Sequence, residues 1–372
     1  MYDSISLFSG AMGLDLGLEK AGIEFRVCQD FDPSCYETML INGKPGMTGD
    51  IRAIDSETIL KKANLKAGEA FLLCGGPPCQ PFSTAGKRLG INDPRGSLFM
   101  EYVRMVDETR PRFFVFENVK GLTSIAVDEN GAPGGVLEII LSEFHRIGYK
   151  TVHGILDAVN FGVPQFRERM IIIGSRDNEK INLPYPTHFQ KHQCADLRWR
   201  TLGEAIRDLE DNPGACTHFS EERLRYLRMV PEGGNWRDLP LELQPAAMGG
   251  AWKSGGGKVG FYRRLSYSQP SPTVVTSPVQ KATMMCHPTK DRPLSVKEYA
   301  RIQQFPENWK ITGTISNQYK QIGNAVPVGL AEAVGQAIIA TATGTTEVCT
   351  KRNRGTSAHK NNDVFEVKRN GN

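Results

Sequence analysis

Cys79 is the side chain best suited to covalent chemistry in this sequence. It lies in the segment Cys74-Gly75-Gly76-Pro77-Pro78-Cys79-Gln80-Pro81-Phe82-Ser83, where neighbouring prolines restrict the backbone. The segment follows the apolar run 71–74, and in open α/β sheets ligands bind where strands end. Most isolated cysteines are small buried hydrophobic residues, an interpretation that we keep for Cys74. The pattern therefore predicts Cys79 as a nucleophile, because a cysteine thiolate is a strong one.

One carboxylate and two guanidinium groups are candidates for the same site. Glu117 ends the apolar run from Phe113, and a carboxylate there is costly unless it is paired or used. Arg167 and Arg169 precede the apolar run 170–173, and in an extended segment they point to the same side. Two cations could then converge on one site. The alternatives are a structural role for Glu117 and a solvated face for the arginines.

A glycine-rich segment suggests a binding site for a nucleotide-like ligand. Phe8-Ser9-Gly10-Ala11-Met12-Gly13-Leu14-Asp15-Leu16-Gly17 follows an apolar run and opens a helical pattern. Asp30 stands about 20 residues after Gly10, where an acid can bind ribose hydroxyls, and Phe31 beside it could stack on a base. The spacing is neither G-x-G-x-x-G nor a phosphate-binding G-K-[ST] loop, which argues against nicotinamide and ATP. A tight turn with a solvated aspartate is the alternative.

Alternating strand and helix patterns would position these residues. Short apolar runs typical of strands buried on both faces occupy 5–8, 25–28, 71–74, 113–116 and 170–173. Helical patterns lie between them, at 14–21, 97–106 and 136–147, and a further apolar helix is expected at 328–340. This alternation predicts a doubly wound α/β fold with a parallel sheet.

The chain changes character after Pro184. Residues 211–290 hold nine Gly and eight Pro, with ten Lys and Arg against six Asp and Glu, and include Trp236, Trp252, Phe261, Tyr262 and Tyr267. Basic, aromatic and glycine residues together are typical of nucleic-acid contacts, although the signal is weak by itself. Capping boxes are expected at Thr201–Glu204 and Ser295–Glu298.

Composition excludes several classes of protein. The 372 residues carry 45 Lys and Arg against 41 Asp and Glu, and no apolar run reaches the roughly 18 residues of a membrane span. The eight cysteines form no C-x-x-C pair, so neither a zinc knuckle nor a disulfide framework is expected. We therefore expect a cytoplasmic protein without a membrane segment or a metal site.

Taken together, the motifs resemble the DNA (cytosine-5)-methyltransferases of bacterial restriction-modification systems over residues 3 to 340. The matching segments, in the family's order, are Phe8-Ser9-Gly10 onward, Gly76 to Ser83, Glu117-Asn118-Val119, Gln165-x-Arg167-x-Arg169, Arg292-Pro293-Leu294-Ser295, Gln303-Gln304-Phe305-Pro306 and Gln321 to Pro327. The resemblance implies a Rossmann-like sheet of the type that binds S-adenosylmethionine, with a smaller, loop-rich target-recognition domain. We expect a catalytic domain at 1–185 completed by 318–340, a small domain at 186–317 and a disordered tail at 341–372.

The resemblance also implies a mechanism. Cys79 would add to C6 of a cytosine flipped out of duplex DNA, and Glu117 would protonate N3 of that base. C5 would then take the methyl group of S-adenosylmethionine, leaving S-adenosylhomocysteine, with no metal involved. Arg169 and Arg167 would favour the thiolate form of the cysteine.

The resemblance implies binding residues as well. Around the cofactor it places Phe8, Gly10, Gly13, Asp30, Phe31, Asp50, Ile51, Leu98, Asn324 and Val326, with Asp30 on the ribose and Asp50 on the adenine amine. Gln80 would contact DNA, and Ser83, Lys87 and Arg88 would belong to a loop that closes over it, unless 83–90 is an ordinary surface loop. Arg263, Arg264 or the turn 255–258 would read base edges, since arginine pairs well with guanine.

Two other functions fit parts of the pattern. An RNA-modifying branch of the family shares the cysteine motif, but its Cys-Phe-Thr tripeptide is missing from the variable region. A catalytically inactive DNA-binding protein would not need Cys79, Glu117, Arg167 and Arg169 together. The favoured interpretation is a monomeric methyltransferase that acts on double-stranded DNA, with a possible partner restriction endonuclease that shares its site.

Overall fold

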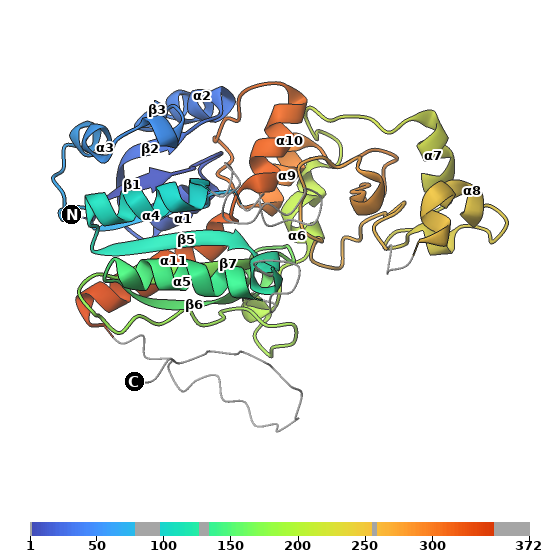
Figure 1. Cartoon of the computed structure of the whole chain (residues 1–372). Coiled ribbons are helices and arrows are strands. Elements are labelled where there is room, and N and C mark those ends of the chain that lie inside the picture. Colours follow the sequence, from blue (N-terminus) through green and yellow to red (C-terminus); the bar gives the residue numbers. More distant parts are fainter. Residues whose placement is uncertain (1, 79–96, 126–133, 255–258, 346–372) are drawn as a thin grey trace.

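A seven-stranded sheet forms the centre of the larger part of the molecule (Figure 1). The computed structural model describes residues 2–78, 97–125, 134–254 and 259–345. The strands follow the order β3-β2-β1-β4-β5-β7-β6. Their bounds are β1 (Asp3–Leu7), β2 (Glu24–Asp30), β3 (Gly46–Thr48), β4 (Leu72–Gly75), β5 (Phe113–Val119), β6 (Lys150–Asp157) and β7 (Glu168–Ser175).

The sheet is parallel only in part. Strands β1 to β5 pair in parallel, whereas β7 pairs antiparallel with both β5 and β6. The expectation of a parallel sheet was therefore wrong for β7, which runs opposite to the other six strands. The connection from β6 to β7 explains this, because a parallel pair needs a crossover of a dozen or more residues. Here β6 ends at Asp157 and β7 begins at Glu168.

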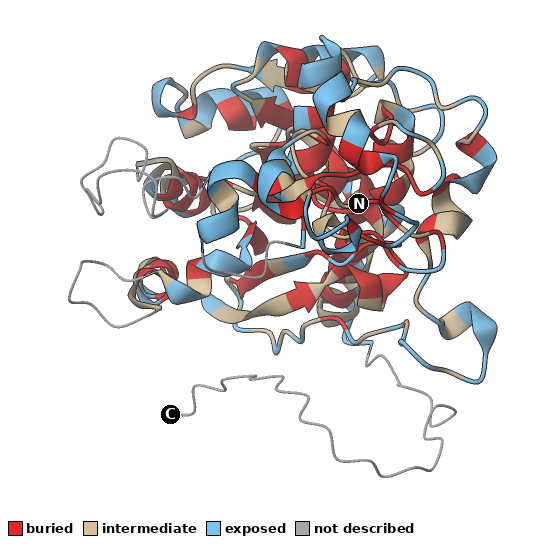
Figure 2. Cartoon of the chain, turned by 90° about the vertical axis from the view of Figure 1, so that its right-hand side faces the viewer, coloured by how far each residue is buried: buried red, intermediate tan, exposed pale blue. Residues whose placement is uncertain are grey.

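Helices cover both faces of the sheet. The core on one face includes α1 (Gly13–Lys20), α2 (Pro33–Ile41) and α11 (Val328–Thr343), and the core on the other includes α3 (Ser56–Ala63), α4 (Ser97–Thr109) and α5 (Gly135–Arg146). Neighbouring residues of β5 alternate between the two cores, with Phe113 and Val115 in the first and Phe114 and Phe116 in the second. This alternation is the expected signature of a strand buried on both faces. Figure 2 shows the buried residues gathered inside and the exposed ones on the outer helix faces.

Helix α11 packs closely against α1. A side chain on Gly17 would place its Cβ 2.3 Å from the carbonyl oxygen of Val328, so only glycine allows this approach. The stretch 315–343 is apolar and long enough to cross a membrane by composition, and its most apolar part is 56% buried. It is divided between α10 (Ile315–Asn324) and α11. Burial of α11 against α1 identifies it as a core helix.

The region between β7 and α10 forms a smaller, less regular part. Its helices are α6 (Leu202–Ile206), α7 (Glu221–Leu227), α8 (Gln244–Met248) and α9 (Val296–Ile302), and α7 and α8 lie far from the sheet in Figure 1. Both expected capping boxes are present, at α6 and α9. A separate small core includes Tyr226, Leu227 and Tyr262. The expected domain boundary at 317 falls inside α10.

Candidate active site

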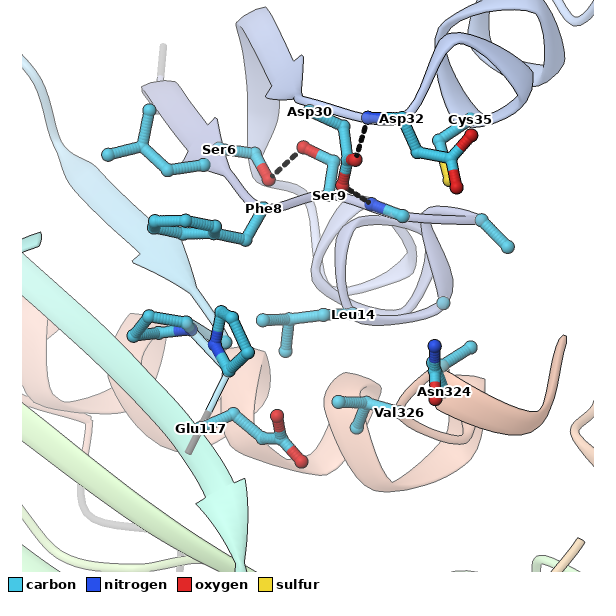
Figure 3. Close-up of a pocket in the computed structure, with 18 of the residues that line it drawn as sticks. Ser6, Phe8, Ser9, Leu14, Asp30, Asp32, Cys35, Glu117, Asn324 and Val326 are labelled. Carbon is cyan, nitrogen blue, oxygen red and sulfur yellow. Dashed lines mark hydrogen bonds between the residues drawn. The ribbon is translucent and has the colours of Figure 1, made fainter. Parts of the chain in front are cut away.

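A cavity of about 560 Å³ opens at the carboxyl ends of the central strands (Figure 3). Its volume is in the range of ligand pockets. All ten residues expected around a cofactor line it, from the loop after β1 and the start of α1, the ends of β2 and β3, the start of α4, and the end of α10 with the residues after it. They are Phe8, Gly10, Gly13, Asp30, Phe31, Asp50, Ile51, Leu98, Asn324 and Val326. Glu117, Arg167 and Arg169 line the same cavity.

The loop after β1 is held to the end of β2 through Asp30. The backbone N–H of Gly10 donates to Oδ2 of Asp30 at 2.7 Å, and the N–H of Asp32 donates to Oδ1 at 2.8 Å. Gly10 has a φ of +54°, which glycine adopts without strain. Burial raises the pKa of Asp30, although these two N–H groups oppose the shift. The carboxylate is thus fixed in place, with further lone pairs available for ligand hydroxyls.

The opposite side of the loop lies against the segment after α10. A Cβ on Gly13 would lie 2.2 Å from the carbonyl oxygen of Val326. Because Gly13 has no side chain, Asn324 and Val326 can approach it and line the cavity. Residues from the beginning of the chain and from its later part thus form one site.

Gly13→Ala is expected to weaken cofactor binding, because Val326 would have to move. Overpacking costs about 1–3 kcal/mol, which corresponds to a rise of about 5- to 150-fold in the dissociation constant of S-adenosylmethionine if the whole cost falls on binding. Isothermal titration calorimetry measures this. Gly250→Ala is a suitable control, since no atom lies within 4 Å of an added Cβ there. An unchanged affinity in Gly13→Ala would contradict the close-packing argument.

Phe31 and Asp50 lie at the open part of the cavity. Phe31 is 69% exposed, unusual for a phenylalanine, and its ring is available for stacking. Asp50 caps a short 3₁₀ turn and accepts from Nε of Arg52 at 2.9 Å. The Arg52 contact lowers the pKa of Asp50. Asp50 is therefore an ionised acceptor, which suits a ligand amine.

Glu117 forms a buried ion pair with Arg169. Its Oε1 lies 2.8 Å from Nε of Arg169, and only 12% of its side chain is exposed. Burial raises the pKa of Glu117, while Arg169 and Arg167 oppose the shift. Figure 3 shows Glu117 across the cavity from Asp30. A carboxyl group in this setting is suited to hold or transfer a proton.

The loop after β4 packs directly against Glu117. A Cβ on Gly76 would lie 2.6 Å from Oε2 of Glu117, so only glycine allows this contact. The Asn118 amide donates to the carbonyl oxygen of Pro77 at 3.1 Å and fixes the loop to β5. Pro77 and Pro78 line the cavity. The residue before Cys79 in the chain is thus at the site.

Arg167 holds three segments together. Its guanidinium donates to the carbonyl oxygens of Val274 and Gly323, each at 2.8 Å, and the residue is 1% exposed. Arg167 and Arg169 do converge on one cavity, as expected, but through different contacts: Arg169 pairs with Glu117, and Arg167 binds backbone. Arg167 is therefore a positioning residue in this structure.

The residues expected to contact DNA are described only in part. Cys79, Gln80, Ser83, Lys87 and Arg88 lie outside the described residues, as does the turn 255–258.

Arg264 is a correction to the expected DNA contacts. The residue is 5% exposed, and its guanidinium donates to the carbonyl oxygens of Val230 and Leu227 at 2.8 Å and to Asp291 at 2.6 Å. It supports the fold and cannot reach a base edge in this conformation. Arg263 is half-buried and donates to the carbonyl oxygen of Met284 at 3.0 Å.

Four charged residues of the cavity wall were not anticipated: Asp15, Asp32, Arg52 and Lys320. Asp15 carried a visible signal, since it is a lone acid within the apolar stretch 14–18. The other three are surface-type residues, and only the fold brings them to the cavity. Among the described residues no cluster of three or more His, Cys, Asp or Glu could hold a metal.

Comparison with known proteins identifies relatives along most of the chain. Residues 2–340 match the family model of C-5 cytosine-specific DNA methylases. The chain is 40% identical to the type II methyltransferase M.PspPI of Psychrobacter sp. over 91% of its length and 79% of the relative, and 39% identical to M.Sau96I of Staphylococcus aureus over 91% and 76%.

Solved structures share the fold at lower identity. A prophage-encoded protein from E. coli, described as a DNA modification methyltransferase, has a TM-score of 0.66 at 22% identity and covers 92% of this chain and 100% of its own. The Entamoeba histolytica methyltransferase EhMeth has a TM-score of 0.60 at 15% identity, covering 91% and 98%. At these identities the likeness supports the architecture alone.

Proposed function

The chain belongs to the family of C-5 cytosine-specific DNA methylases, and we propose that it methylates a flipped-out cytosine through a covalent adduct with Cys79. It is a DNA (cytosine-5)-methyltransferase related to type II restriction-modification enzymes, which use S-adenosylmethionine. The observation that best supports the proposal is Glu117. Its buried carboxyl group faces the cavity beside the loop that leads to Cys79.

The residues of the site suit the binding of the cofactor. Asp30 would accept the ribose hydroxyls, Phe31 would stack on adenine and Asp50 would accept the adenine amine. Asn324 and Val326 would close the opposite side of the pocket. When bound, S-adenosylmethionine supplies an electrophilic methyl group.

The protein's part in catalysis is to activate the cytosine. The Cys79 thiolate adds to C6 while Glu117 donates a proton to N3, so that C5 gains the electron density to take the methyl group. The C5 proton then passes to water, the thiolate leaves C6 and the N3 proton returns to Glu117, which restores the aromatic ring. Arg169 holds the Glu117 carboxyl group in position, and Arg167 and Arg169 add positive charge beside the developing negative charge of the base.

DNA binding would involve both parts of the chain. The cytosine must leave the stack to reach Glu117, and the unstacking costs a few kcal/mol that contacts with DNA must offset. Gln80, Ser83, Lys87 and Arg88 are proposed to close over the DNA, and the region 186–317 to select the sequence. Arg263 stays a candidate for base recognition, whereas Arg264 does not. We propose a cytoplasmic monomer, with a restriction endonuclease of the same specificity as a possible companion.

The first test is to map methylation in cells that lack other cytosine methylation. Cells expressing the protein should show bisulfite-resistant cytosines in one short motif of plasmid and host DNA. The Cys79→Ser variant should show none, because serine is a much poorer nucleophile at neutral pH. A soluble wild-type protein that protects no DNA cytosine would contradict the proposal, and RNA from the same cells would be sequenced next.

The covalent step can be tested separately. DNA carrying 5-fluorocytosine in the mapped motif should form an adduct that survives denaturing electrophoresis. Methylation without such an adduct would preserve the activity and remove the covalent role of Cys79.

A further inference from the structure

Asp15 is the one carboxylate of the cavity wall for which the described residues offer no hydrogen-bond or ion-pair partner. The wall carries Asp15, Asp30, Asp32, Asp50 and Glu117. Arg52 pairs with Asp50, Arg169 with Glu117 and Lys320 with Asp32, the last at 3.1 Å, while Asp30 accepts two backbone N–H groups. Both oxygens of Asp15 are buried without a hydrogen bond of ordinary length. The Ser6 hydroxyl lies near them and opposes the rise in the pKa of Asp15, but it is already paired with the Ser9 hydroxyl at 2.7 Å.

The surroundings of Asp15 make this lack of a partner costly. Asp15 lies in α1, is 0% exposed and faces the sheet near Ser6, which pairs in register with Cys28 on β2 and Cys74 on β4. The negative charge of Asp15 contributes to the raised pKa values of both thiols. An ionised carboxylate without a partner is strongly disfavoured in such an environment.

The nearby charges do not supply the missing partner. Glu19 lies one turn further along α1 and pairs with Lys44 at 2.5 Å, so the charge of Lys44 is already matched. Cys28 and Cys74 stay neutral, because burial raises their pKa values well above the ordinary range. A bound ligand that carries a positive charge could therefore neutralise the charge of Asp15.

The proposed cofactor carries such a cation. S-adenosylmethionine has a positively charged sulfonium, whereas S-adenosylhomocysteine has a neutral thioether, and the two share all their other charged groups. A carboxylate in a low-dielectric wall interacts with a charge in the cavity more strongly than water would allow. The two ligands therefore differ in the positive charge at sulfur, with which an unpaired carboxylate would interact.

We propose that Asp15 is an electrostatic selectivity residue that makes the cavity favour the cationic cofactor over its neutral product. The inference rests on the proposed cofactor site and deepens it. Binding of the methyl donor provides the charge that Asp15 lacks. Transfer of the methyl group removes that charge, which weakens binding of the product and favours its release.

The test is calorimetric titration of S-adenosylmethionine and S-adenosylhomocysteine into the full-length protein. Asp15→Asn should weaken binding of S-adenosylmethionine about tenfold and change that of S-adenosylhomocysteine less than twofold. Glu37→Gln is the matched control, because it neutralises an exposed acid of α2 that does not line the cavity. This control should leave the ratio of the two affinities unchanged.

A measurement on the wild-type protein gives an independent check. Burial raises the pKa of Asp15 to about 7, so the carboxylate ionises as the pH rises through this value. Preference for S-adenosylmethionine should therefore increase severalfold between pH 6 and pH 8. The groups that the two ligands share cancel in the ratio.

Each outcome decides the matter. Equal weakening of both ligands in Asp15→Asn would show that Asp15 acts on a group that the two ligands share, or on the fold alone, and would overturn the selectivity proposal, as would no change in either. If the variant does not fold, a wild-type ratio that stays constant with pH would overturn it. Failure of both ligands to bind the wild-type protein would instead remove the proposed cofactor site.

Discussion

Glu117→Gln is expected to lower the rate of methyl transfer by roughly two to four orders of magnitude, the usual contribution of a general acid or base. Glutamine has a similar shape but cannot deliver a proton to N3 of the cytosine. Burial raises the pKa of Glu117, which keeps a proton available closer to neutral pH than an exposed glutamate would. Single-turnover transfer of labelled methyl groups to the mapped DNA motif measures the chemical step directly.

The matched control for this prediction is Glu168→Gln. Glu168 lies next to Arg169 in the chain, but it is exposed, pairs with Lys120 and does not line the cavity. We expect its rate to stay within about twofold of the wild type, as for most surface substitutions. Cofactor affinity of Glu117→Gln should change far less than its rate. A Glu117→Gln rate within tenfold of the wild type would remove Glu117 as the proton donor.

The sequence predicted the cavity well because its residues follow the ends of strands. Gly10, Asp30 and Glu117 each follow or end an apolar run, and parallel strands bring these ends to one edge of the sheet. This rule needs only strand positions, which buried strands reveal clearly. The closure of the site by Asn324 and Val326 came from the family resemblance, since no local pattern links them to Gly13.

The strands at the edge of the sheet could not be predicted from the sequence pattern. Strand β3 has three residues, and most residues of β6 are only half-buried, so neither carries a clear apolar run. Helices α2 and α3, which are also on the periphery, were not anticipated. Strand β7 runs antiparallel to its neighbours because the connection from β6 is too short for a crossover. The length of that connection cannot be judged from the sequence unless β6 is recognised first.

Arg264 shows a different limit of sequence patterns. A basic residue in a region rich in glycine and aromatic residues indicates nucleic-acid contacts on average. The same region has little regular structure, so many of its backbone carbonyls lack N–H partners from helices or strands. The buried guanidinium of Arg264 satisfies several of these carbonyls, including those of Val230 and Leu227. Composition alone does not distinguish these two uses of arginine.

The free energy of unfolding of the cofactor-free protein is expected to fall between pH 5 and pH 8. In Asp15→Asn this fall should be smaller by about 2–3 kcal/mol. The pKa of Asp15 is about 7 in the folded protein against an ordinary 3.8. Each unit of this difference is worth about 1.4 kcal/mol. Because the folded state holds the proton more tightly, ionisation destabilises it as the pH rises from 3.8 to about 7, and the full penalty of roughly 4 kcal/mol is reached above pH 7.

Urea unfolding of the wild type, Asp15→Asn and Glu37→Gln at both pH values measures the effect. The other buried titrating groups are common to the three proteins, so the difference between wild type and Asp15→Asn isolates Asp15. Glu37→Gln should follow the wild type, because Glu37 is exposed and does not line the cavity. Parallel pH profiles for wild type and Asp15→Asn would show that the carboxylate finds a partner in the free protein. A steeper loss of unfolding free energy in the wild type would instead mean that the ionised carboxylate of Asp15 destabilises the cofactor-free protein. A cationic ligand would then remove this destabilisation.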